Sequence, residues 1–179
     1  MRGRSIAAAV VALGLLLAAS PVAADDRWRV GASLGSIELD RNVTPRQSAE
    51  AYWSLHAARV LTPHFELTGK VLRVAVTDKR GFESELHALV PGLRWVWLPR
   101  KRVQPIVFGG VGLARLERSA GGVSVDDEGL AFDLGLGVRV ALGERRRLHL
   151  LLEIETLVED TFGVESTHNG ANLGLTWSF

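Results

Sequence analysis

The stretch "LAFDLGLGVRVAL", residues 130–142, alternates without interruption between large apolar residues and residues that are small or charged. Successive side chains of a β-strand point to opposite faces of the sheet, so this period of two predicts a strand. One face of that strand is wholly apolar, and the other carries Ala, Gly, Asp and Arg. The apolar face consists of Leu130, Phe132, Leu134, Leu136, Val138, Val140 and Leu142.

The same alternation recurs along most of the chain and predicts eight strands. Their expected ranges are 27–38, 49–60, 65–76, 84–97, 104–117, 128–142, 148–158 and 168–179. Short connections at 62–64, 98–103 and 143–147 alternate with longer ones at 40–47, 77–83, 118–127 and 161–168. This layout is typical of outer-membrane barrels, which have short turns at one end and longer loops at the other. The sequence therefore predicts an all-β fold, an eight-stranded antiparallel up-and-down transmembrane β-barrel.

Residues 1–24 have the pattern of a cleavable signal peptide. Arg2 and Arg4 precede an uninterrupted apolar run over residues 6–19, and "VAA" precedes Asp25. The run is too short for a membrane-spanning helix, which needs about 20 residues. We expect cleavage after Ala24, which leaves residues 25–179 as the barrel domain.

Composition limits the possible partners of the exported chain. Without the two arginines of the signal, 19 Lys+Arg face 20 Asp+Glu, and the sequence has no Cys. A nucleic-acid-binding protein would show a strongly basic face, so no nucleic-acid partner is expected. The five histidines have no metal-ligand spacing, and Gly110 and Gly112 lack the third glycine and the helix of a dinucleotide loop. We expect no metal and no cofactor.

The polar faces of the strands indicate which way the apolar faces point. The interior of an eight-stranded barrel is just wide enough for its own side chains, so small residues and paired charges fit there. We therefore predict apolar faces toward lipid; a soluble periplasmic barrel with an apolar ligand inside is the alternative. The predicted lumen charge network comprises Arg29, Glu50, Glu66, Lys70, Arg94, Asp133, Arg139, Glu153 and Glu155.

Aromatic residues gather near the predicted strand ends on the short-turn side. Trp28, Trp95, Trp97 and Trp177 fit an aromatic girdle at a membrane interface. The last strand keeps its alternation to the final residue of the sequence. The apolar positions of that ending are Leu173, Leu175, Trp177 and Phe179.

This ending resembles the C-terminal signal of outer-membrane β-barrel proteins, and the chain as a whole is similar to small eight-stranded barrels of the OmpA/OmpX type. The resemblance implies export to the outer membrane of a Gram-negative cell. It also implies recognition of the ending by the barrel-assembly machinery, contact with outer-membrane lipids and lipopolysaccharide, and a monomeric state.

The resemblance leaves an enzymatic alternative open, because some barrels of this kind remove acyl chains from lipid A. Those enzymes carry a His and a Ser two residues apart on the seventh strand. Here that strand has His149 without a nearby Ser, while Ser166 and His168 lie before the eighth strand, beside Glu165. We expect no catalytic residues. The predicted function is a structural or interaction role in the cell envelope, with a packed lumen and no open pore.

Overall fold

The computed structural model describes residues 28–38, 49–77, 83–143 and 146–179. Within them the chain forms eight strands and no helix long and apolar enough to cross a membrane. The predicted signal peptide lies outside the described residues. The strands are β1 (Trp28–Glu38), β2 (Ala49–Thr62), β3 (Phe65–Thr77), β4 (Glu83–Val96), β5 (Val103–Ala120), β6 (Val123–Leu142), β7 (Leu148–Thr161) and β8 (Val164–Ser178).

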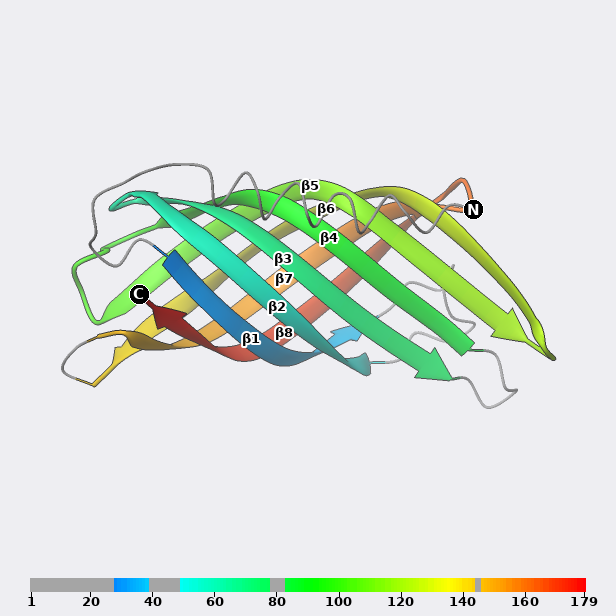
Figure 1. Cartoon of the computed structure of the whole chain (residues 1–179), viewed down its shortest axis with the longest axis horizontal. Coiled ribbons are helices and arrows are strands. Elements are labelled where there is room, and N and C mark those ends of the chain that lie inside the picture. The colour runs from blue at the N-terminus through cyan, green and yellow to red at the C-terminus, as the bar shows by residue number, and fades with distance from the viewer. Residues whose placement is uncertain (1–27, 39–48, 78–82, 144–145) are drawn as a thin grey trace.

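The strands form one closed antiparallel barrel in which each pairs with its sequence neighbours and β1 also pairs with β8 (Figure 1). The register can be followed strand by strand from Trp28 around the barrel. It returns to β1 at Glu38, ten residues further along. This stagger accounts for the steep tilt of the strands, because closing a sheet links register shift to tilt. The predicted up-and-down barrel is confirmed.

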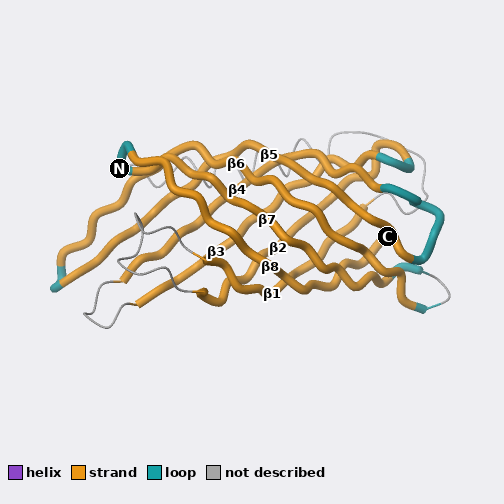
Figure 2. Tube along the Cα trace, turned by 180° about the vertical axis from the view of Figure 1, so that it is seen from behind, coloured by secondary structure: helices purple, strands orange, loops and turns teal. Residues whose placement is uncertain are grey.

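The two ends of the barrel differ in their connections. Three connections lie at one end: residues 63–64 join β2 to β3, residues 97–102 join β4 to β5, and β6 ends at Leu142 six positions before β7 begins. Trp28 also donates a backbone hydrogen bond to Phe179 at this end. This end is called the short-turn end below; the opposite end, where β5 meets β6 and β7 meets β8, is called the hairpin end (Figure 2).

The prediction of longer loops at 118–127 and 161–168 is wrong. Strands β5 and β6 stay paired as far as Ala120 and Val123, and β7 and β8 as far as Thr161 and Val164. Two-residue turns close both hairpins. Gly121 and Gly122 have φ of 59° and 84°, and such positive values suit tight hairpin turns. The other two predicted longer loops, 40–47 and 77–83, lie largely outside the described residues.

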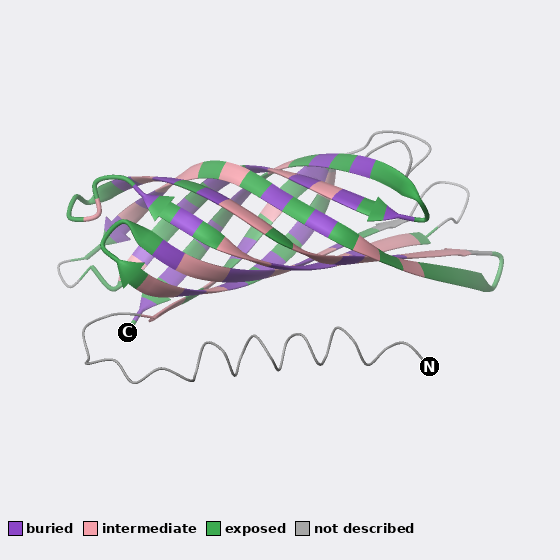
Figure 3. Ribbon diagram, turned by 90° about the horizontal axis from the view of Figure 1, so that it is seen from above, coloured by how far each residue is buried: buried purple, intermediate pink, exposed green. Residues whose placement is uncertain are grey.

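The apolar faces of the strands point outward, as predicted for a membrane barrel. On β6, Leu134 is 64% exposed and Leu136 is 54% exposed, whereas Asp133 before them and Arg139 after them are buried. The same alternation of buried and exposed residues recurs along the other strands (Figure 3), with an interruption in β4, where Ala88, Leu89 and Val90 are all buried. A soluble barrel would bury its apolar faces around an apolar ligand, so this exposure contradicts the soluble alternative.

The lumen is not polar throughout, which corrects the prediction that small and charged residues fill it. Near the hairpin end, inward side chains form an apolar layer that includes Ile37, Leu72, Leu86, Leu116 and Leu157. These residues explain why the alternation in β3, β4 and β5 is less clear in the sequence. Both faces of those strands are apolar at this level, so hydropathy alone does not separate them.

Gly135 leaves room in the barrel wall for a lumen side chain. A Cβ atom there would collide with the ring of Phe108 and lie 2.6 Å from the carbonyl oxygen of Ile154. At Gly170 the nearest atom to such a Cβ, on Ile37, is 3.3 Å away. We therefore expect Gly135→Ala to lower the free energy of unfolding by about 1–3 kcal/mol, as overpacking does.

Urea unfolding of the reconstituted barrel, followed by tryptophan fluorescence, measures this change. Gly170→Ala is the matched control and should have the smaller effect. Equal losses in the two variants would contradict the packing argument.

Candidate functional site

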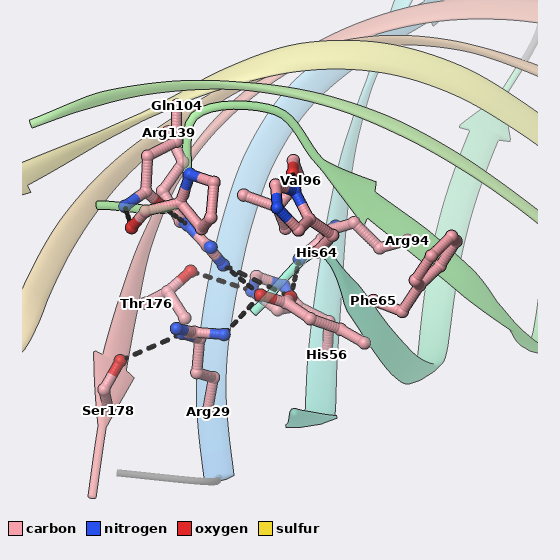
Figure 4. Close-up of polar contacts among 12 residues, drawn as sticks. Arg29, His56, His64, Phe65, Arg94, Val96, Gln104, Arg139, Thr176 and Ser178 are labelled. Carbon is pink, nitrogen blue, oxygen red and sulfur yellow. Dashed lines mark hydrogen bonds and ion pairs between the residues drawn. The ribbon is translucent and has the colours of Figure 1, made fainter. Parts of the chain in front are cut away.

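A cluster of charged side chains fills the lumen on the short-turn side of the apolar layer, with Glu66 of β3 at its centre. Glu66 forms an ion pair with Arg29 of β1 and lies 2.9 Å from Nη1 of Arg139 of β6. Arg94 of β4 approaches it at 3.8 Å. The carboxylate of Glu66 is buried, and the three arginines, labelled in Figure 4, approach it from three other strands. Glu66 thus ties together four strands.

A second cluster lies beside the first, around Lys70 of β3. Lys70 forms ion pairs with Glu155 and, at 2.6 Å, with Asp133. The hydroxyl of Tyr52 donates a 2.6 Å hydrogen bond to Glu155 and accepts one of 2.9 Å from the amide of Asn172. All these side chains are buried, so each charge has its partner inside the wall of the barrel.

The two clusters meet at Arg94 and Phe108. Arg94 also pairs with Glu153 at 2.8 Å, and the ring of Phe108 lies 5.7 Å from the guanidinium of Arg94 and 5.3 Å from the ammonium of Lys70. Together the clusters hold four cations and four carboxylates. Their formal charges cancel, which suits a site surrounded by low-dielectric wall.

The structure brings eight of the nine residues of the predicted network into these ion pairs. Glu50 is the exception: it is half-buried on β2, two positions before Tyr52 and nearer the hairpin end. Sequence reasoning missed the uncharged members Tyr52, Gln104 and Asn172. Alternation places Tyr52 and Asn172 on the inward faces of their strands, but only the register shows that Tyr52 reaches Glu155 and that Asn172 reaches Tyr52.

Gln104 connects this network to a turn outside the lumen. Its side-chain oxygen accepts a 2.9 Å hydrogen bond from Arg139. Its side-chain nitrogen donates to the carbonyl oxygens of Pro99 at 2.7 Å and Lys101 at 3.0 Å. The β4–β5 turn is therefore held from inside the barrel.

The predicted girdle tryptophans all lie at the short-turn end. Trp95, Trp97 and Trp177 are exposed, Trp28 is half-buried, and Trp95 and Trp97 stack with centroids 5.5 Å apart. In the predicted C-terminal signal, Leu173, Leu175, Trp177 and Phe179 all project outward and are exposed. Phe179 donates a 3.0 Å backbone hydrogen bond to Trp28, so the ending takes part in closing the barrel.

A family model described as "Outer membrane protein beta-barrel domain" matches residues 8–179. The chain belongs to this family. It is an outer-membrane protein, in agreement with the exposed apolar wall. No curated protein sequence matches the chain.

Solved structures of other outer-membrane barrels have the same fold as this family member. Neisserial surface protein A matches with a TM-score of 0.72 and 11% identity, over 85% of this chain and 97% of that one. Ail, the attachment invasion locus protein of Yersinia pestis, matches with a TM-score of 0.56 and 10% identity, over 86% of this chain and 97% of that one. The outer membrane enzyme PagL matches with a TM-score of 0.50 and 12% identity, over 84% of this chain and 99% of that one. At these identities the similarity shows the fold alone.

The serine and histidines considered for a hydrolase lie inside this barrel, whereas the acid beside them does not. Ser166 and His168 are buried on β8, and Nε2 of His168 is 3.5 Å from Oε1 of the buried Glu159 on β7. Glu165, the acid adjacent in sequence, is exposed, and His149 is buried near the other end of β7. Gly110 and Gly112 lie within β5 and form no phosphate loop. The Ser and His therefore face away from the lipid surface.

Replacing Glu66 tests the lumen network. Glu66→Gln leaves Arg29, Arg94 and Arg139 close together without their shared carboxylate. We expect it to lower the free energy of unfolding by about 3–5 kcal/mol, as breaking a buried ion pair does. The measurement is the urea midpoint of the barrel in lipid vesicles.

Glu85→Gln is the control, because Glu85 pairs with Arg73 and His87 at the partly exposed outer wall. It should shift the midpoint much less, since exposed pairs contribute little. Similar shifts in both variants would show that Glu66 holds no special position.

Proposed function

We propose that this protein has a structural or interaction role in the cell envelope and acts through its outer surfaces, not as a pore. The supporting observation is the filled lumen. The ion-paired clusters occupy its short-turn half, and the layer of Ile37, Leu72, Leu86, Leu116 and Leu157 lies across it near the hairpin end. An ion crossing the barrel would have to separate buried pairs and then lose its water in the apolar layer, and both steps are costly.

The partners that we propose follow from the outer wall. Its exposed apolar side chains contact outer-membrane lipids. The hairpin end meets lipopolysaccharide, because the longest connection in the sequence, the ten residues between Glu38 and Ala49, joins β1 to β2 at that end, and longer connections of such barrels face outward. The barrel-assembly machinery reads the exposed ending from Leu173 to Phe179.

The barrel is monomeric, because its closed sheet leaves no unpaired edge for a second copy in the part that the structure describes. Residues 1–24 are removed on export.

Conductance in planar lipid bilayers tests the filled lumen. We expect the purified barrel to give no reproducible current step. The gel mobility of the same preparation, boiled and unboiled, checks that the inserted protein is a closed barrel. Reproducible steps from a preparation that passes this check would overturn the proposal.

Incubation with lipid A tests the enzymatic alternative. Because Ser166 and His168 face the lumen, an acyl chain in the membrane does not reach them. We expect no released fatty acid by mass spectrometry, and no difference between the unmodified protein and Ser166→Ala. Release that disappears in Ser166→Ala would establish a hydrolase.

A further inference from the structure

Two turns at the short-turn end carry a concentration of positive charge. Residues 98–102, "LPRKR", and 143–147, "GERRR", hold six Lys or Arg and one Glu. The described cations among them are all exposed, and they are called the basic turn surface below. They are Arg100, Lys101, Arg102, Arg146 and Arg147.

The structure joins the two turns into one surface. Nη1 of Arg146 donates a 2.9 Å hydrogen bond to the carbonyl oxygen of Arg100, and the backbone nitrogen of Ala141 donates to Arg102 at 2.8 Å. The turns are neighbours because β5 pairs with β6 from Val103 and Val140 onward. Charges that are over forty residues apart in the sequence therefore act together.

The β4–β5 turn has a fixed shape. Gln104 holds the carbonyl oxygens of Pro99 and Lys101 from the lumen side, and Lys101 donates a 2.9 Å backbone hydrogen bond to Leu98. Little backbone freedom remains to be lost when a ligand binds, which favours binding. The cations are thus presented on a rigid support.

The basic turn surface adjoins the lipid-facing wall. Trp97 is 58% exposed and Leu98 is 48% exposed, and Trp97 stacks on Trp95. Leu98 has a φ of 55°, a left-handed conformation that is unfavourable for a leucine. Aromatic side chains at a membrane interface sit at the level of the lipid headgroups. The next residues in the chain, Arg100 and Lys101, are then within reach of headgroup phosphates.

We propose that the basic turn surface binds the phosphate groups of anionic phospholipids in the leaflet that the short turns face. Guanidinium and ammonium groups are the usual partners of phosphate, and basic side chains next to a membrane attract anionic lipids. The adjoining Trp97 and Leu98 favour a lipid over a soluble polyanion, because they hold the acyl region beside the same turn. The inference goes beyond the proposed function, since it assigns a lipid class.

The hairpin end supplies a contrast. Arg73 and Arg115 also project from the wall, but Arg73 pairs with Glu85, and Arg115 lies 2.9 Å from Glu117 and 3.2 Å from Asp126. Carboxylates already neutralise these arginines. Their replacement is therefore a control that removes positive charge from the wall without touching the basic turn surface.

Electron paramagnetic resonance of spin-labelled lipids around the reconstituted full-length mature barrel tests the proposal. The readout is the association constant of phosphatidylglycerol relative to phosphatidylcholine. We expect a preference of about threefold or more, given the attraction of clustered basic residues for anionic lipid. The ratio of the two association constants should fall to about one in Arg100→Gln/Lys101→Gln/Arg102→Gln. About 0.5 M salt should also lower the ratio, because salt screens the charges.

Arg100→Lys/Arg102→Lys should keep the preference, and Arg73→Gln/Arg115→Gln should leave it unchanged. Heat-modifiable gel mobility confirms that each variant is a folded barrel, and bilayer conductance reports on the filled lumen separately. A folded barrel without lipid preference would overturn the proposal. If a folded barrel without lipid preference instead binds inorganic polyphosphate in phosphatidylcholine discs, the ligand is a soluble polyanion, and the proposal is overturned. A loss in Arg73→Gln/Arg115→Gln equal to that in the triple variant would overturn it as well.

Discussion

The pairing of β1 with β8 is the constraint on which the rest of the structure depends. A membrane offers no water to an unpaired backbone group, so a sheet that crosses it has to close. The ladder from Arg29 and Ser178 to Glu38 and Asn169 provides that closure, and Trp28 and Phe179 complete it at the short-turn end. Closure with eight strands also sets the width of the lumen, and the narrow lumen decides which side chains fit inside.

The narrow lumen explains why its charges come as balanced clusters. An isolated buried ion is strongly destabilising, whereas one that meets opposite charges and hydrogen bonds is tolerated. Glu66 supplies the opposite charge for arginines from three strands, and Lys70 supplies it for two carboxylates. Because each pair joins different strands, the network fits only one register of the barrel. The apolar layer beyond it needs no such pairing and closes the lumen by packing.

The lumen and the outer surface are not independent. Arg139, which pairs with Glu66, also donates to Gln104, and Gln104 holds the turn that carries Arg100, Lys101 and Arg102. The interior network therefore helps to fix the shape of the basic turn surface. At the hairpin end β5 and β6, and β7 and β8, continue to two-residue turns, and the outward Arg73 and Arg115 are paired with carboxylates. The two ends thus present different chemistry to their surroundings.

The sequence by itself determined the number of strands, the direction of their faces and the end at which four of the five tryptophans lie. It could do so because alternation along a strand is a local property. Only the tertiary structure decided that Glu66, and not another carboxylate, collects the arginines. It also decided that Tyr52 reaches Glu155 and that Asn172 reaches Tyr52. It also revealed the apolar layer, since Leu72, Leu86 and Leu116 lie in strands that are apolar on both faces. These contacts join residues far apart in the chain, and the register that brings them together is set by barrel closure.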